Sequence, residues 1–159
     1  MTTAEGTCLK TTSREHYPTE VDKLGSPVYR SVLQTQEMHD QPASFDYEIS
    51  VDFSRTHCNP PVWHDVHPHD YRVTLVITST RRPEDLYGLD MVEAERLLRA
   101  YVDELPECIN DHPGTRDGTT EALCLYFAGR PLSDPLARLV SVSVAETPER
   151  VTRYDLPPF

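Results

Sequence analysis

The chain has 159 residues, with 26 acidic and 15 basic side chains, a formal net charge of −11 and a pI near 5.0. This acidity argues against nucleic-acid binding, which depends on clustered lysine and arginine side chains. No apolar run approaches the roughly 18 residues of a transmembrane helix, so we expect no membrane association.

We expect a partly ordered N-terminal extension over residues 1–44, followed by a single domain over residues 45–159. The extension is polar and contains three prolines, and the one regular element expected in it lies around residues 27–34. The first residues lack the hydrophobic stretch of a signal peptide, so we expect a cytoplasmic protein.

Two alternating segments predict a pair of antiparallel strands. Apolar and polar residues alternate without a break over residues 45–54, which is the pattern of a half-buried strand. Residues 71–79 repeat this alternation. Pro60, Pro61 and Pro68 lie between the two segments and predict a long loop as the connection.

Helical periodicity follows the second strand. The spacing of apolar residues predicts a helix over residues 91–105, closed by Pro106. Its apolar stripe is expected to consist of Val92, Leu97, Leu98, Tyr101, Val102 and Leu105. A second helix is predicted over residues 119–129, with Thr119 as its N-cap and Gly129 at its end.

Two more alternating segments, residues 138–147 and 150–156, predict a second antiparallel pair joined by a turn at Pro148. The order of strand, strand, helix, helix, strand, strand indicates an α+β fold, with a four-stranded antiparallel sheet and both helices on one face. The open edges of such a sheet favour pairing with neighbouring subunits.

Lysine and cysteine usage excludes two further kinds of chemistry. The lysines are Lys10 and Lys23, so no P-loop lysine or Schiff-base lysine is available in the domain. The four cysteines are far apart and form no CxxC motif, which predicts free thiols and no disulfide framework.

Three histidines lie at the ends of the first two predicted strands. His57 ends the first strand, and His67 and His69 begin the second. Alternate residues of a strand point the same way, so His67 and His69 share a face, which His57 reaches if the strands form a hairpin. Three histidines with an open fourth position are typical of catalytic zinc. The alternative is a group of exposed or core histidines that binds no metal.

Two other features are candidates for chemistry. Asp111 and His112 are adjacent in a predicted turn, where the carboxylate could orient the imidazole as a general base. Glu146 ends the third strand, where a carboxylate can accept two parallel hydrogen bonds from an amidine-like or guanidine-like ligand edge. In isolation, a surface pair and a solvated charge are the simpler interpretations.

Taken in order, these motifs resemble one family. The stretches FSRTH, HPHDYRVTLVI, YGLDMVEAERLL, NDHPGT, TTEAL and VSVAET resemble the pattern of the 6-pyruvoyl-tetrahydropterin synthase and 6-carboxy-tetrahydropterin synthase family. That pattern is F-x-x-x-H, H-G-H-N-Y, G-M-V before a helix, D-H in a turn, T-x-E-N at a helix start, and E-T. The resemblance covers residues 45 to about 156.

The resemblance implies a tunnelling fold (T-fold), in which sheets from several subunits close a barrel. It therefore implies a homo-oligomer, either a trimer or a hexamer of two stacked trimers, with a small-molecule substrate bound at subunit interfaces. It also implies zinc as the cofactor, held by His57, His67 and His69. The metal would polarise a substrate carbonyl or hydroxyl group.

By the same match, Asp111 and His112 are the pair that transfers protons. Glu146 is the carboxylate that anchors the amino-pyrimidinone edge of a pterin. Thr147 beside Glu146, and Thr120 in the motif that opens the second helix, are the accompanying candidates for substrate binding.

The chain departs from the family at the reactive cysteine. Relatives carry this residue four to six positions before the first histidine of H-G-H, and here positions 61–63 hold no cysteine. Cys58 lies beside His57, nine residues before His67. His64 and Asp65 are candidates for a replacement base.

We therefore expect a zinc-dependent lyase or cyclase that acts on a small carbonyl-bearing or heterocyclic metabolite, repurposed for specialised small-molecule biosynthesis. Two alternatives stay open. One is 6-pyruvoyl- or 6-carboxy-tetrahydropterin synthase activity with a substitute base. The other is a non-catalytic relative that keeps the zinc and binds a ligand.

Overall fold

The computed structural model describes residues 20–21, 27–28 and 41–158. The chain divides into two units, Met1–Asp40 and Gln41–Phe159. In the first unit, strands β1 (Glu20–Val21) and β2 (Pro27–Val28) form a short antiparallel pair. The rest of the element expected around residues 27–34 lies outside the described residues, and the division at residue 44 stays a prediction.

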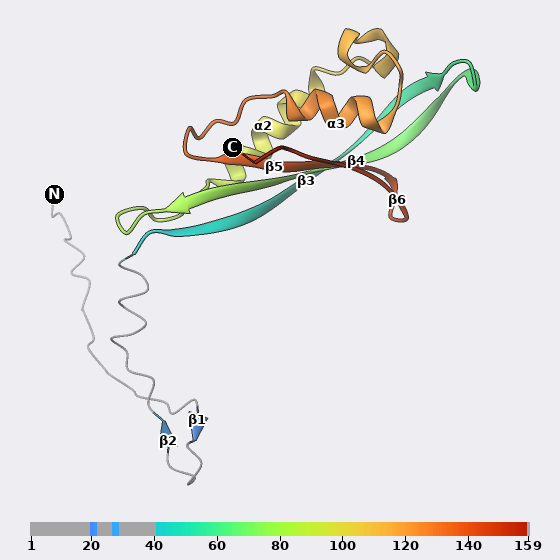
Figure 1. Cartoon of the computed structure of the whole chain (residues 1–159). Coiled ribbons are helices and arrows are strands. Elements are labelled where there is room, and N and C mark those ends of the chain that lie inside the picture. The colour runs from blue at the N-terminus through green and yellow to red at the C-terminus, as the bar shows by residue number, and fades with distance from the viewer. Residues whose placement is uncertain (1–19, 22–26, 29–40, 159) are drawn as a thin grey trace, which may run out of the picture. The chain divides into compact units, whose positions relative to one another are not determined.

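The second unit has the α+β architecture that the sequence predicted. Its elements are β3 (Ala43–Asn59), β4 (Trp63–Arg81), α2 (Met91–Asp103), η1 (Ile109–Asp111), η2 (Pro113–Thr115), α3 (Thr120–Ala128), β5 (Arg138–Thr147) and β6 (Arg150–Asp155). The strands form a four-stranded sheet in the order β3-β4-β5-β6, and all neighbours are antiparallel. Both α-helices lie on one face of this sheet (Figure 1).

The core lies between the sheet and the two helices. Alternate strand residues point into it, because successive side chains of a strand face opposite ways. Its fully buried members include Val73, Val142, Val144, Leu98, Leu123 and Phe127. Phe53 of β3 packs edge to face against Phe127 of α3, with ring centroids 6.2 Å apart. This contact connects β3 to helix α3 within the core.

The β3–β4 hairpin is longer than the alternation predicted, and the expected long loop is wrong. β3 runs to Asn59 and β4 starts at Trp63, so only residues 60–62 connect them. β5 pairs with β4 only between Arg72 and Thr78. The hairpin therefore extends past the rest of the sheet on the side of its turn (Figure 1).

Pro68 lies inside β4, although a proline usually interrupts a strand. Its partner in the ladder is Thr56, which donates its N–H to the carbonyl oxygen of Glu107 at 2.9 Å, away from β4. The two residues thus form a pair that exchanges no backbone hydrogen bonds. The missing N–H of Pro68 costs the β3–β4 ladder nothing, which is why the strand tolerates a proline that predicted a loop.

Helix α2 ends at Asp103, two residues earlier than predicted, and differs from the predicted apolar stripe in one residue. Val92, expected in the apolar stripe, is 79% exposed, whereas Ala94, Leu98 and Val102 are buried. A helix turns by about 100° per residue, so Val92 is displaced by roughly 120° from Leu98 around the axis. Asp90 caps the helix by accepting hydrogen bonds from the backbone N–H groups of Val92 and Glu93.

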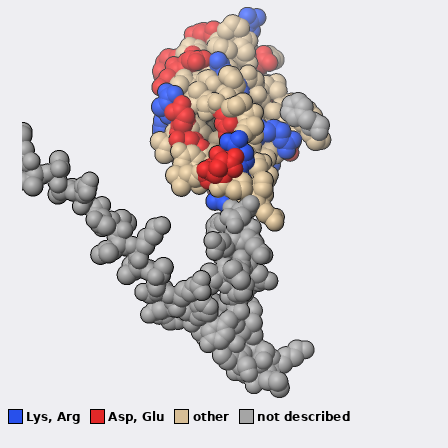
Figure 2. All heavy atoms as spheres, turned by 90° about the vertical axis from the view of Figure 1, so that its left-hand side faces the viewer, with Lys and Arg blue, Asp and Glu red and all other residues tan. Residues whose placement is uncertain are grey.

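The surface of the second unit is rich in charged groups. On the face that Figure 2 shows, acidic and basic side chains of the described residues are interspersed. Several are exposed ion pairs, such as Arg96 with Glu93 and Arg99 with Glu95, which contribute little stability individually. None of the helices in the described part of the chain has the length and hydrophobicity that a bilayer crossing requires.

Two leucines of α3 test the position of the core. Leu123 is fully buried and Leu125 is 56% exposed. We expect Leu123→Ala to lower the free energy of unfolding by about 2–5 kcal/mol, because it leaves a cavity under the sheet. Leu125→Ala should change it by less than about 0.5 kcal/mol. Urea unfolding at one fixed protein concentration measures both values, and equal losses would contradict the packing described.

Candidate metal centre and pocket

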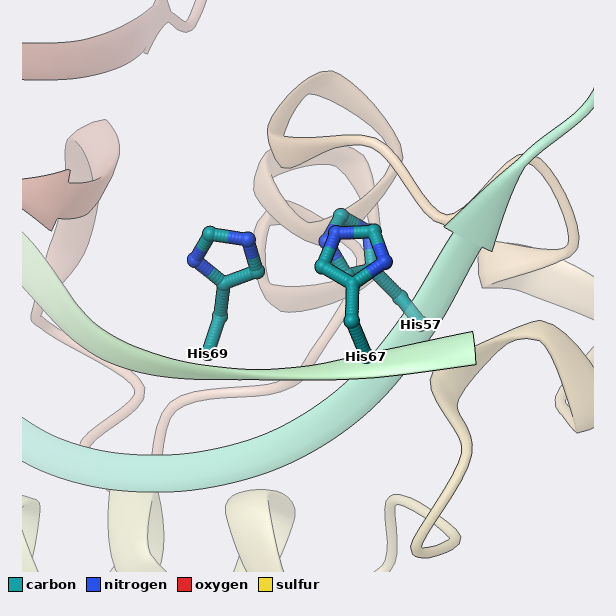
Figure 3. Close-up of side chains that lie close together, drawn as sticks. All are labelled: His57, His67 and His69. Atoms are coloured by element: carbon teal, nitrogen blue, oxygen red, sulfur yellow. The ribbon is translucent and has the colours of Figure 1, made fainter. Parts of the chain in front are cut away.

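Three imidazoles come together where the β3–β4 hairpin extends past β5. His57 and His67 lie directly opposite each other in the antiparallel register, and His69 follows His67 by two residues on the same face of β4. Each ring offers one nitrogen such that all three atoms lie within 4.8 Å of one another. Figure 3 shows His67 and His69 side by side on β4, with the His57 ring behind that of His67.

His57 is the most enclosed of the three, with 4% of its surface exposed. Its Nδ1 lies 2.6 Å from the carbonyl oxygen of Gly118, and because a carbonyl only accepts, Nδ1 carries the proton. The other nitrogen, Nε2, is buried and has no hydrogen-bond partner among the described residues. A buried lone pair without a donor is unfavourable, and a metal ion would satisfy it.

The carbonyl that orients His57 depends on a glycine. Gly118 has a φ of +64°, and a Cβ there would lie 2.3 Å from the carbonyl oxygen of Cys58. Asn110 also joins this loop to Cys58. Its Oδ1 accepts a hydrogen bond from the N–H of Cys58, and its Nδ2 donates one to the carbonyl oxygen of Cys58, each at 2.9 Å. The loop before α3 is thus held against the end of β3.

The environment of His57 keeps its ring neutral. Burial lowers the pKa of His57 below its usual 6.5, and the neighbouring His67 and His69 lower it further. The hydrogen bond to Gly118 and the charge of Glu146 oppose this shift only in part. Since a metal binds the neutral imidazole, the lowered pKa of His57 favours metal binding by this side chain at neutral pH.

The histidines open onto a pocket of about 540 Å³. Its lining consists of His57, Asn59, Trp63, Asp65, His67, His69, Glu146 and Arg150. Three imidazole nitrogen donors with room for a fourth ligand fit zinc, which takes four ligands and leaves one position open in catalytic sites. The volume suits a small metabolite.

Glu146 reaches this pocket from the end of β5. Its side chain is 20% exposed, and its Oε2 lies 4.0 Å from Nη1 of Arg150, across the β5–β6 turn. This ion pair is long, so the carboxylate keeps lone pairs for a ligand. The structure therefore brings four of the predicted site residues together, namely the three histidines and Glu146.

The other predicted residues lie elsewhere in the chain. His64 does not line the pocket as the described residues define it, whereas its neighbour Asp65 does; both lie where the β3–β4 register shifts, between Trp63 and His67. Thr147 lines a smaller cavity beside Asp52. Thr120 bonds Thr152 through their hydroxyl groups at 2.6 Å.

Asp111 and His112 do not line the pocket of their own chain, as far as the described residues define it. The backbone orients His112, because the N–H of Gly114 donates to its Nδ1 at 3.0 Å. The neutral ring therefore carries its proton on Nε2. The ring also packs edge to face on Tyr126, with centroids 5.0 Å apart.

Asp65, a candidate replacement base in the sequence, lines the pocket, whereas Trp63 was missed. Trp63 could have been found, because it continues the order of Asp65, His67 and His69 toward the turn. Tyr71 continues this order the other way, into the core. Its ring lies 5.9 Å from that of His69, its buried hydroxyl has no partner among the described residues, and burial raises its pKa. Arg150 gave no such signal, because it comes from the far end of the chain.

The sheet with two helices on one face makes the chain a T-fold protein, as the sequence motifs predicted. A family model described as 6-pyruvoyl tetrahydropterin synthase matches residues 45–157, and the chain belongs to this family. The structure resembles that of Caenorhabditis elegans 6-pyruvoyl tetrahydropterin synthase, with a TM-score of 0.60 and 17% sequence identity over 72% of this chain and 97% of that one. No curated protein matches the sequence.

The lowered pKa of His57 makes the stability of the metal-free protein depend on pH. Below about pH 6.5 the unfolded chain protonates this histidine more readily than the folded chain does, so the free energy of unfolding should fall as the pH falls. Urea unfolding with a chelator, between about pH 5 and pH 8, measures this slope. In His57→Gln the slope should be smaller, and an unchanged slope would contradict the buried neutral ring.

Proposed function

We propose that this chain is a zinc-dependent lyase or cyclase of the pterin-synthase type, which acts on a small carbonyl-bearing or heterocyclic metabolite in specialised biosynthesis. The observation that carries the proposal is the buried, unpartnered Nε2 of His57 beside two further imidazoles. Zinc held by His57, His67 and His69 would supply a Lewis acid for a substrate carbonyl or hydroxyl group.

Glu146 is the group that orients the substrate. A carboxylate at a strand end can accept two parallel hydrogen bonds from the N–H edge of an amidine-like ring. It lines the same pocket as the three histidines, so a ring anchored there presents its substituent toward them. Thr147, the next residue, and Thr120 are secondary candidates for substrate contacts.

Asp65 is better placed than His64 to remove a proton. It lines the pocket and shares the face of β4 with both metal-binding candidates of that strand. A carboxylate at hydrogen-bond distance from an acidic C–H or O–H group can act as general base. In this interpretation Asp65 replaces the thiol that relatives carry near this position, and His64 is not required.

Asp111 and His112 act as the second proton-transfer group, in the pocket of a neighbouring subunit. Two observations support this arrangement: neither residue lines the pocket of its own chain as the described residues define it, and the N–H of Gly114 occupies Nδ1 of His112, which leaves Nε2 for proton transfer. A base and an acid on different subunits would then work on opposite sides of one substrate.

Closure of the sheet requires such neighbours. β3 and β6 are the outer strands of the four-stranded sheet, and outer strands that remain unpaired invite association. We propose a homo-oligomer, a trimer or a hexamer, in which these edges pair between subunits. The cytoplasmic location expected from the sequence stays a prediction.

Metal analysis tests the centre. The purified protein should hold about one zinc per chain, and His67→Ala should weaken zinc affinity by more than about 100-fold, since it removes a direct ligand. His64→Ala is the matched control, because this histidine lies three residues before His67 on β4 and is not among the described residues that line the pocket. Zinc loss in both variants, or a wild-type protein that binds no zinc, would contradict the proposal.

Turnover of dihydroneopterin triphosphate separates the repurposed enzyme from the parent activity. We expect no 6-pyruvoyl tetrahydropterin, because positions 61–63 lack the thiol of the parent reaction. Formation of this product, lost by about 10²–10⁴-fold in His112→Ala, would show that the parent reaction is retained with a substitute base. Product that His112→Ala leaves unchanged would contradict the role of His112.

A further inference from the structure

Arg150 introduces a positive charge into the pocket. It is the first residue of β6 and pairs with Thr147 across a tight turn formed by Pro148 and Glu149. This turn brings its side chain into the lining that contains His57, His67 and His69. Among the described residues of that lining, Arg150 is the one with a permanent positive charge, whereas Asp65 and Glu146 are acidic.

The guanidinium of Arg150 is weakly engaged within the chain. Its ion pair with Glu146 spans 4.0 Å, and the side chain is 66% exposed. Other arginines of the unit contact carboxylates closely: Arg72 with Asp52 at 2.6 Å, and Arg153 with Asp155 at 2.7 Å. An ion pair at such a separation, with one partner exposed to solvent, contributes little to stability. The N–H donors of Arg150 are therefore available to a bound molecule.

We propose that Arg150 makes this pocket selective for a substrate that carries an oxyanion, a carboxylate or a phosphate. A guanidinium binds either group through two parallel charge-assisted hydrogen bonds. In a protein with a net charge of −11 and two acidic residues in the pocket, an anionic substrate needs such a counter-charge.

This proposal rests on the proposed function, because it assumes that the pocket binds the substrate. It assigns complementary tasks to the residues that flank the β5–β6 turn. Glu146 accepts hydrogen bonds from an N–H edge, and Arg150 donates hydrogen bonds to an oxyanion. A substrate that carries both groups is held at two points, with its reactive carbon directed toward the histidines.

Two probes, inorganic phosphate and pyruvate, test the anion site in the full-length protein. NMR titration gives the Kd of each probe for the wild type, Arg150→Gln and Arg153→Gln. Arg153 is the matched control, because it lies on the same strand and is paired with Asp155. We expect Arg150→Gln to raise the Kd of the preferred probe by about tenfold or more, and Arg153→Gln to change it by less than about twofold.

The probe that binds the wild type more tightly identifies the oxyanion as phosphate or carboxylate. Arg150→Lys keeps the charge but loses the planar fork, so its Kd should lie between those of the wild type and Arg150→Gln. Unchanged affinity for both probes in Arg150→Gln, or the absence of saturable binding to the wild type, would overturn the proposal.

Parallel titrations of chelator-treated protein, with zinc measured in each sample, separate this proposal from the metal centre. The guanidinium acts without the metal, so the difference between wild type and Arg150→Gln should persist in metal-free protein. If the protein holds no zinc but shows this difference, the proposed zinc-dependent function is contradicted and the anion site is supported. If the protein holds zinc but shows no difference, the anion site is contradicted and the metal centre is supported.

Discussion

The candidate site depends on the register between β3 and β4. This register places His57 opposite His67, and a slip of one residue would turn the histidines of one strand to the other face. The apolar face of the hairpin fixes it, because Ile49, Val51 and Phe53 must all reach the core. The histidine cluster is thus a consequence of hydrophobic pairing that lies farther along the same two strands.

Burial and orientation act together on His57. The same enclosure that lowers its pKa also removes water from Nε2, and the carbonyl of Gly118 decides which nitrogen carries the proton. Gly118 has a positive φ and no room for a Cβ, so a glycine outside the described pocket lining sets the tautomer of His57. Asn110 holds the two segments in contact.

Alternation in the sequence predicted most of the fold, since it reports which face of a strand is buried. It placed the strand over residues 138–147 with the bounds observed, and it put His67 and His69 on one face. Alternation failed at residues whose position depends on a contact with a segment that is distant in the sequence. Pro68 is tolerated because Glu107 takes the N–H of the residue opposite, and Arg150 enters the pocket only through strand order. Neither of these two contacts changes the pattern of apolar and polar residues in the local sequence.

The position of the pocket on the protruding hairpin has an evolutionary consequence. Asn59, Trp63 and Asp65 line it from beyond the end of β5, and Trp63 is largely exposed. Exchanging the exposed Trp63 and Asp65 disturbs no core packing, so new side chains can be sampled at these two positions at little cost in stability. The three histidines and the helices beneath the sheet are retained meanwhile. A lineage can therefore change which molecule it recognises while it inherits the same scaffold and the same centre.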